Sequence, residues 1–165
     1  LWLEIASKIV AHRHNAYFII VGDGPFRQRI VNKISELGLS HNILIAGLQQ
    51  DVRPYLASMD IYMMSSIFEG LPVALLEAMA CGLPVVTTDA GGIKQVVRDG
   101  EDGLVCPVAK ATSLVDLAIT LIDHQAQRVR FGGNARRRIE ETFSLDRMVM
   151  QVEKLYRHVA GENPQ

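Results

Sequence analysis

Short runs of apolar residues alternate along the chain with segments in which apolar residues recur every three or four positions. The short runs predict β-strands that are buried on both faces, at residues 17–21, 42–46, 61–64, 85–88 and 104–106. Helical spacing occupies residues 2–12, 26–37, 52–58, 73–81, 92–98 and 112–123, and residues 125–160 contain a helical pattern alone. Strands that alternate with helices this often predict an α/β fold, namely a Rossmann-like parallel sheet with flanking helices and a helical C-terminal segment.

Length and composition are those of an ordinary globular domain. The chain has 165 residues, of which 48% are hydrophobic and 21% charged, and we predict one domain over residues 1–160 with a tail at 161–165. The formal net charge is −1. Because proteins that bind nucleic acid carry an excess of basic residues, we expect no nucleic-acid partner. The sequence has no uninterrupted run of about 18 apolar residues, so we predict no transmembrane helix.

Neither the cysteines nor the histidines form a pattern that binds metal. Cys81 and Cys106 are not part of a C-x-x-C pair and lie beside apolar residues, so we expect both to be small, buried side chains in a reducing cytoplasm. His12 and His14 are two positions apart and would point in different directions on a helix. We therefore predict no metal site and no metal cofactor.

Ligands of parallel α/β sheets bind at the carboxyl ends of the strands, so the loops there are the candidate sites. The first such loop, Gly22-Asp23-Gly24-Pro25, begins like a dinucleotide-binding fingerprint. Arg27 replaces the third glycine, however, and His41 and Asn42 stand where an acidic residue is expected. We therefore favour a tight turn over a nicotinamide or flavin site, and a close approach of another ligand to this backbone stays open.

The loop over residues 65–72 leads into a helix whose start is well defined. Pro72 suits the first helical turn, while Gly82 and Pro84 suit the region just beyond its end. The helix would begin at the ligand side of the sheet. Its unpaired N–H groups and the positive end of its dipole can bind an anion there, and phosphate is the usual one.

Two glutamates flank this helix start. Glu69 precedes it, and Glu77 lies within the helix among apolar residues, where a carboxylate is costly unless it is paired. Eight residues of helix rise about 12 Å and rotate by two full turns plus about 80°. The side chains of Glu69 and Glu77 can therefore lie on the same side of the helix. This layout suits a nucleotide sugar, with its diphosphate at the helix start and a hydroxyl-bearing group at each end. The alternative for Glu77 is a solvent-facing position without a ligand.

A second glycine turn, Asp89-Ala90-Gly91-Gly92, follows the fourth strand at the same edge. Two interpretations of its glycines stay open. They satisfy the geometry of the loop, or they let the same ligand approach the backbone.

The ordered set of these motifs resembles the donor-binding half of the retaining glycosyltransferases of family 4, which have the two-domain GT-B fold. An E-x7-E motif runs from Glu69 to Glu77, inside the segments Phe68-Glu69-Gly70-Leu71-Pro72 and Leu76-Glu77-Ala78-Met79-Ala80. Further matching blocks are Val21-Gly22-Asp23-Gly24-Pro25, Ala46-Gly47-Leu48, Asp89-Ala90-Gly91-Gly92 and Gly103-Leu104-Val105. The resemblance covers most of the chain and implies one half of a GT-B fold.

The resemblance also implies a role for each matching residue. Glu69 would lie by the transferred sugar as the catalytic residue, and Glu77 would bind the ribose hydroxyls. Gly70 and Leu71 would offer backbone N–H groups to the sugar and the diphosphate. The remaining donor-binding candidates are Phe68, Gly22, Gly24, Leu48 and Gln49, of which the last two would border the base. The family needs no metal, and this sequence has no D-x-D motif.

The implied function is transfer of a hexosyl group, with retention, from a nucleotide sugar to a polysaccharide or glycolipid acceptor, and UDP is the expected nucleotide. Two alternatives stay open, a GT-B module that binds nucleotide without catalysis and a sugar-nucleotide epimerase. The family's N-terminal acceptor domain, the first strand of its sheet and an Arg and a Lys that grip the diphosphate match no part of this chain. We therefore expect the C-terminal domain of a longer, cytoplasmic enzyme, which does not transfer sugar by itself. Peripheral association of the full-length enzyme with the inner face of the membrane is a further expectation.

Overall fold

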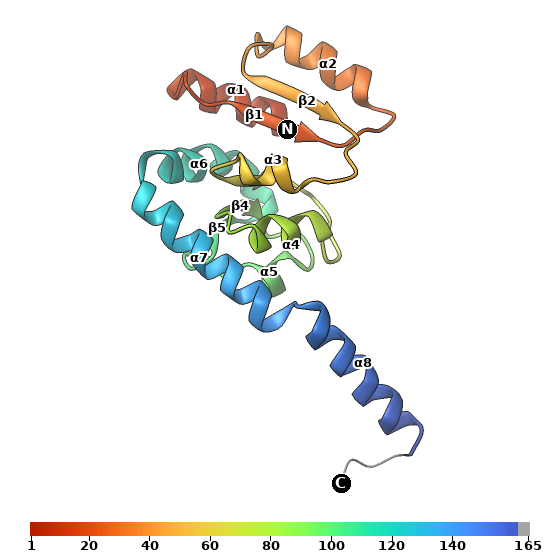
Figure 1. Cartoon of the computed structure of the whole chain (residues 1–165). Coiled ribbons are helices and arrows are strands. Elements are labelled where there is room, and N and C mark those ends of the chain that lie inside the picture. The colour runs from red at the N-terminus through yellow and green to blue at the C-terminus, as the bar shows by residue number, and fades with distance from the viewer. Residues whose placement is uncertain (162–165) are drawn as a thin grey trace.

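The computed structural model describes residues 1–161 and contains five strands, all paired in parallel (Figure 1). One sheet pairs β1 (Phe18–Val21) with β2 (Ile43–Gly47), and the other has the order β3 (Tyr62–Met64), β4 (Val85–Thr88) and β5 (Gly103–Cys106). All five predicted strands are confirmed, each within one residue of its expected ends. The parallel α/β fold is therefore confirmed.

The helices also follow the predicted pattern. The first six α-helices are α1 (Trp2–His12), α2 (Arg27–Glu36), α3 (Arg53–Ala57), α4 (Val73–Ala80), α5 (Ile93–Val96) and α6 (Leu114–Asp123). A 3₁₀ helix, η1 (Val108–Ser113), leads into α6. The expected C-terminal helix is divided into α7 (Gln125–Thr142) and α8 (Leu145–Val159) because Ser144 between them has an extended backbone.

β4 is the most deeply buried strand, and its alternate residues face two different layers of the core. Val85 packs with α4, α5 and α7, through residues such as Leu75 and Met79. Val86 points to the other face, where it packs with α1 and α6. Because successive side chains of a strand point to opposite faces, β4 holds both layers together.

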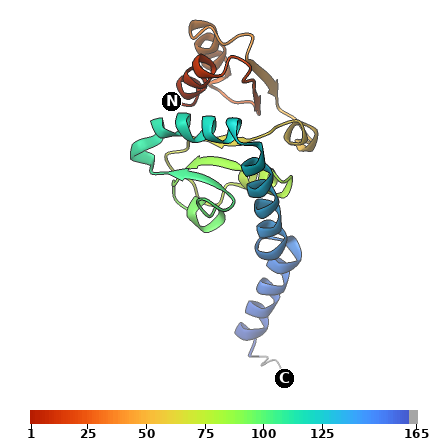
Figure 2. The same cartoon turned by 90° about the vertical axis from the view of Figure 1, so that its left-hand side faces the viewer.

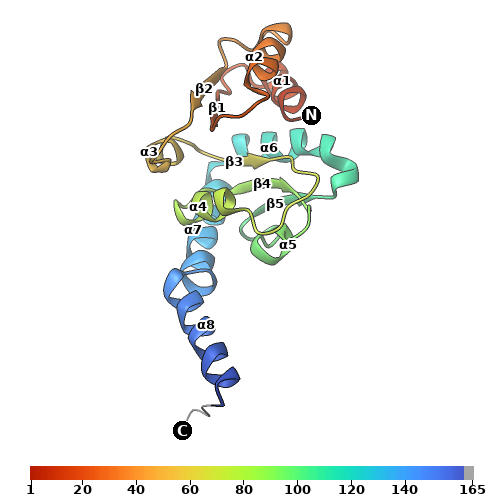
Figure 3. The same cartoon turned by 90° about the vertical axis from the view of Figure 1, so that its right-hand side faces the viewer.

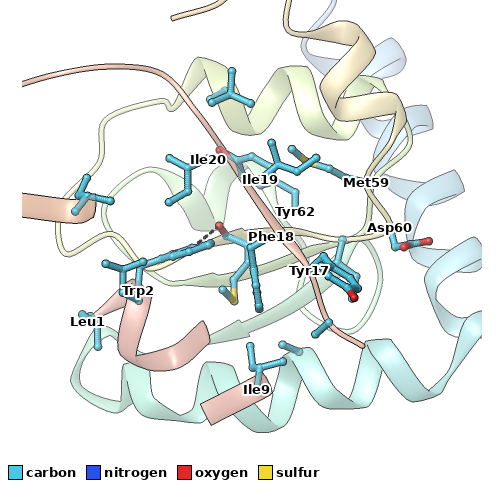
Figure 4. A pocket seen from close by; sticks show the side chains of 18 of the residues that line it. Leu1, Trp2, Ile9, Tyr17, Phe18, Ile19, Ile20, Met59, Asp60 and Tyr62 are labelled. Carbon is cyan, nitrogen blue, oxygen red and sulfur yellow. Dashed lines mark hydrogen bonds between the residues drawn. The ribbon is translucent and has the colours of Figure 1, made fainter. Parts of the chain in front are cut away.

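The strands form two sheets rather than one continuous sheet. β1 and β3 do not pair (Figure 3). A cleft is lined by residues of both strands (Figure 4). α1 packs against α6 and contributes Ile5 and Ile9 to the core beneath β4, while Ala6 joins the core of the β1–β2 sheet. α1 thus connects the two sheets on one side of the cleft.

The two cysteines differ in exposure. Cys106 is buried as predicted, but the prediction is wrong for Cys81, which lies exposed just beyond the end of α4.

α8 extends away from the body and has no buried residue (Figure 2). Of the helices within residues 1–161, none combines the length and the apolar character that crossing a membrane requires.

A buried carboxylate joins the end of α5 to the turn before β5 and to α7. Asp102 is fully buried and accepts hydrogen bonds from the backbone N–H and the guanidinium of Arg98, at 2.6–3.0 Å. The guanidinium of Arg138 on α7 lies 3.7 Å away. These contacts compensate the cost of burying the charge.

We expect Asp102→Ala to lower the free energy of unfolding by about 3 kcal/mol, because it removes several charge-assisted hydrogen bonds from a buried position. Urea denaturation followed by circular dichroism measures this change. Asp60→Ala, at an exposed position, is the matched control and should change the free energy of unfolding by less than about 0.5 kcal/mol. Equal effects of the two substitutions would show that the Asp102 contacts do not stabilise the fold.

Candidate functional site

The turns after β1 and β2 lie side by side at the carboxyl edge of the sheet. Gly22 has a φ of +131°, and its N–H donates to the carbonyl of Gly47 at 2.8 Å. Beyond Gly47, the side-chain amide of Gln49 donates to the carbonyl of Ala46 at 2.6 Å, and the Leu48 side chain is 80% exposed. The predicted residues Gly22, Leu48 and Gln49 are therefore brought together at one place.

Gly24 belongs to the same turn, but its backbone is not strained. Its N–H donates to the carboxylate of Asp23 at 2.7 Å, and a Cβ atom added to it would meet nothing within 4 Å. The turn requires the positive φ of Gly22 but does not require a glycine at position 24. The open space around Gly24 leaves its backbone accessible.

The loop over residues 65–72 holds Glu69 in place through hydrogen bonds. The Ser66 hydroxyl donates to the Glu69 carboxylate at 2.7 Å, and the Thr88 hydroxyl at the end of β4 donates to the Ser66 carbonyl at 2.6 Å. The Gly92 N–H donates to the Glu69 carbonyl at 3.1 Å. Both the side chain and the backbone of Glu69 are thus fixed relative to β4.

Gly91 and Gly92 permit a close approach between this loop and the turn after β4. A Cβ atom added to Gly91 would lie 1.9 Å from the Glu69 carbonyl oxygen, and one added to Gly92 would lie 2.0 Å from the Gly70 carbonyl oxygen. Gly91 also has a φ of +51°. Of the two interpretations of this turn, the loop-geometry one is confirmed, because the glycines contact the loop that carries Glu69.

The start of α4 faces this edge of the sheet with unused backbone donors. Pro72 precedes the helix in an extended conformation, and no side chain within residues 1–161 caps this end. The N–H groups of Leu75 and Leu76 donate to the Pro72 carbonyl, which leaves those of Val73 and Ala74 at the exposed first turn. This end of the helix can therefore bind an anion.

Glu69 and Glu77 both influence the hydroxyl of Tyr62 on β3. Burial raises the pKa of Tyr62 above its ordinary value, and the charges of Glu69 and Glu77 raise it further. Glu77 is exposed and lines the cleft together with Ala74. The exposure of Glu77 allows either a ligand or solvent to reach it.

Large apolar side chains are exposed along the same edge. Phe68 is 84% exposed and Leu71 50% exposed, and Ile67 on the same loop and Phe26 just before α2 are likewise open to solvent. Exposed apolar groups that gather in one place indicate a surface that contacts a ligand or another protein. Phe68 and Leu71 lie within two residues of Glu69 in the loop, and their contact with a donor stays a prediction.

Sequence reasoning did not identify the groups that position Glu69. Ser66 precedes Glu69 by three residues and Thr88 ends a predicted strand, but hydroxyl residues are common in such places and gave no distinct signal. Asp89 likewise supports the turn, because its carboxylate accepts from the Val108 N–H and pairs with Lys94, both at 2.8 Å. These contacts, with that of Lys94 the strongest, lower the pKa of Asp89.

Within the described residues 1–161, no group of three or more His, Cys, Asp or Glu side chains could hold one metal ion. The candidate site therefore consists of backbone donors, two carboxylates and exposed apolar side chains. Such a set can bind a phosphate-containing ligand that also carries hydroxyl groups.

Known proteins are similar to this chain in sequence and in fold. N-acetyl-α-D-glucosaminyl L-malate synthase of Bacillus anthracis is 34% identical over 161 residues, which are 98% of this chain and 42% of that protein. The chain therefore spans less than half the length of this relative. Two solved structures share the fold of this chain. The mutant of TarM from S. aureus in complex with Fondaparinux, α-GlcNAc-glycerol and UDP has a TM-score of 0.88 and 23% identity, over 94% of this chain and 32% of that one.

The other solved structure, Alr3699/HepE of Anabaena in complex with UDP, has a TM-score of 0.85 and 24% identity, over 93% of this chain and 44% of that one. The sequence model of the family described as glycosyl transferases group 1 matches residues 1–138. This match includes every strand and every loop of the candidate site. The chain belongs to the glycosyl transferases group 1 family.

Proposed function

We propose that this chain is the donor-binding domain of a retaining glycosyltransferase, which binds a UDP-sugar. In the full-length enzyme a hexosyl group would pass to a polysaccharide or glycolipid acceptor held by a separate N-terminal domain. The observation that carries the proposal is the uncapped start of α4, with Glu69 fixed in the loop before it and Glu77 exposed within the helix.

The similar proteins support a UDP-sugar as the ligand. Both similar solved structures contain UDP, and the name of the Bacillus relative includes an N-acetylglucosaminyl group. The chain's own chemistry agrees, because phosphate suits the first turn of α4 and hydroxyl groups suit a carboxylate acceptor.

Each part of the donor has a matching group in the site. The diphosphate would accept hydrogen bonds from the N–H groups of the first turn of α4, with help from Gly70 and Leu71. Glu77 would accept from the ribose hydroxyls, and Glu69 would accept from the sugar that is transferred. Leu48 and Gln49 would border the base, next to the turn of Gly22 and Gly24. Phe68 would cover the loop side of the donor.

The proposal assigns different parts of the donor to the two glutamates, and this division can be tested. Glu77→Ala should weaken the binding of both UDP and UDP-N-acetylglucosamine, because the ribose is present in both. A hydrogen bond to a charged group contributes about 1.5–3 kcal/mol, so the loss is on the order of ten- to a hundredfold in affinity. Glu69→Ala should leave UDP binding unchanged and weaken only the preference for the nucleotide sugar. Calorimetric titration measures all four affinities.

Glu153→Ala, on the exposed helix α8, is the matched control and should change neither affinity. Equal losses for both ligands in both variants would contradict the division between Glu69 and Glu77. Unchanged binding in both variants would show that Glu77 faces solvent only and that the donor binds elsewhere.

Gly91→Ala should weaken donor binding, because an added Cβ would collide with the Glu69 carbonyl and displace the loop. The positive φ of Gly91 adds strain for any residue with a Cβ. We expect at least a tenfold loss of UDP-N-acetylglucosamine affinity in calorimetry, together with a lower melting temperature. Gly133→Ala in α7, where an added Cβ meets nothing within 4 Å, should keep the affinity of the native chain. Equal donor affinity for the native chain and Gly91→Ala would contradict the role of this turn.

Binding of the donor should not need a divalent cation, because the site would neutralise the diphosphate with backbone N–H groups and the helix dipole. We expect the affinity for UDP-N-acetylglucosamine to be the same with EDTA and with added Mg²⁺ or Mn²⁺. Loss of binding in EDTA, restored by either cation, would overturn the assignment of the diphosphate to the start of α4.

A transferase and an epimerase differ in what they do with the donor alone. The full-length enzyme should leave UDP-N-acetylglucosamine unchanged without an acceptor, apart from slow hydrolysis, whereas an epimerase would convert its sugar. We expect the 165-residue chain by itself to bind the donor and to transfer nothing, since the acceptor would bind to the other domain.

A further inference from the structure

A buried hydroxyl extends the contact between β3 and β4 beyond the end of their pairing. The last residues paired between these two strands are Met64 and Thr87. Thr88, the next residue of β4, is fully buried, and its hydroxyl donates at 2.6 Å to the carbonyl of Ser66, which lies two residues beyond β3. Since a buried hydroxyl without a partner is costly, this bond holds the backbone of Ser66 at the end of β4.

The hydroxyl of Ser66 in turn bonds to one oxygen of the Glu69 carboxylate. It donates to Oε1 at 2.7 Å, and no hydrogen bond to Oε2 is found among residues 1–161. An ionised carboxylate only accepts hydrogen bonds, so Oε2 can accept from an O–H donor such as a sugar hydroxyl. Glu69 is only partly buried, so a ligand can approach it from solvent.

The bond from Ser66 also restricts the conformations of the Glu69 side chain. A glutamate side chain has several rotatable bonds and loses rotamer freedom when it binds a ligand. Ser66 already holds Oε1 and Gly92 already holds the Glu69 carbonyl, so part of this freedom is lost before a ligand arrives. A group that is preorganised in this way binds its ligand more tightly.

We propose that Ser66 and Thr88 are positioning residues that set the preference of this site for a nucleotide sugar over the free nucleotide. Thr88 fixes Ser66, and Ser66 orients Glu69 so that Oε2 accepts a hydrogen bond from a hydroxyl of the transferred sugar. Neither positioning residue touches the nucleotide. This proposal rests on the proposed function, in which Glu69 binds the sugar. If the two hydroxyls only stabilised the loop, their removal would weaken nucleotide and nucleotide sugar alike.

Calorimetric titration of the 165-residue chain with UDP and with UDP-N-acetylglucosamine tests this proposal. The sugar preference is the dissociation constant of UDP divided by that of UDP-N-acetylglucosamine. We expect Ser66→Ala to lower the sugar preference about three- to tenfold and to change the affinity for UDP by less than about twofold. In a chain that already carries Glu69→Ala, adding Ser66→Ala should change the sugar preference by less than about 1.5-fold, because the residue that Ser66 orients is absent.

Thr88 provides a second, independent variant. Thr88→Val removes the buried hydroxyl and nearly keeps the shape of the side chain, so it should lower the sugar preference, whereas Thr88→Ser keeps the hydroxyl and should preserve it. Thr120→Val in α6 is the matched control, because the Thr120 hydroxyl also donates to a backbone carbonyl, that of Asp116, at 2.8 Å. It should leave the sugar preference unchanged. Hydrogen exchange of the Gly92 amide, which bonds to the Glu69 carbonyl, reports whether the loop stays in place in each variant.

The possible outcomes separate this proposal from the proposed function. An unchanged sugar preference in Ser66→Ala, together with a lower one in Glu69→Ala, would overturn the role of Ser66 and leave the donor site standing. An unchanged preference in Glu69→Ala would overturn both. Additive effects of Ser66→Ala and Glu69→Ala would show that Ser66 does not act through Glu69. Equal losses for both ligands in Ser66→Ala and Thr88→Val, with faster exchange of the Gly92 amide, would reduce the two hydroxyls to supports of the loop.

Discussion

The hydrogen bond from the Gly92 N–H to the Glu69 carbonyl fixes the loop on which the proposed donor site depends. It forms only because two consecutive glycines let the backbones of the two loops come into contact. Thr88 adds a second bond, to the Ser66 carbonyl, so the loop is held at both its start and its middle by the end of β4. β4 is itself the most buried strand, so the loop rests on the most rigid part of the molecule.

This arrangement separates the parts of the site that are rigid from those that are open. Glu69 is fixed through its carboxylate and its carbonyl. Glu77 lines the cleft from α4, and no hydrogen bond to its carboxylate is found among residues 1–161. Around them, Phe68 and Leu71 are exposed and available for contact. A rigid carboxylate beside exposed apolar groups suits a site that must position one sugar while it closes over the donor.

The sequence was sufficient to predict the strands, the helices and the edge at which the candidate residues lie. Apolar runs and helical spacing depend on local burial, so they placed β1 to β5 within one residue. Three features were beyond such patterns. The division into two sheets depends on a strand pairing between distant segments, and the exposure of Cys81 depends on what packs beyond α4. The Thr88 hydroxyl bonds to Ser66 across 22 positions of the sequence, and the Ser66 hydroxyl bonds to Glu69 three positions away. Neither contact produces a periodic pattern of residues that could have predicted it.

We propose above all that UDP binds at the start of α4, between Glu69 and Glu77. Titration of the ¹⁵N-labelled chain with UDP, followed by two-dimensional NMR, tests it most directly because each backbone amide reports separately. We expect the largest shifts at Gly70, Leu71, Val73 and Ala74, with smaller shifts at Gly22 and Leu48. Shifts confined to other parts of the chain, or no shifts at saturating UDP, would contradict it.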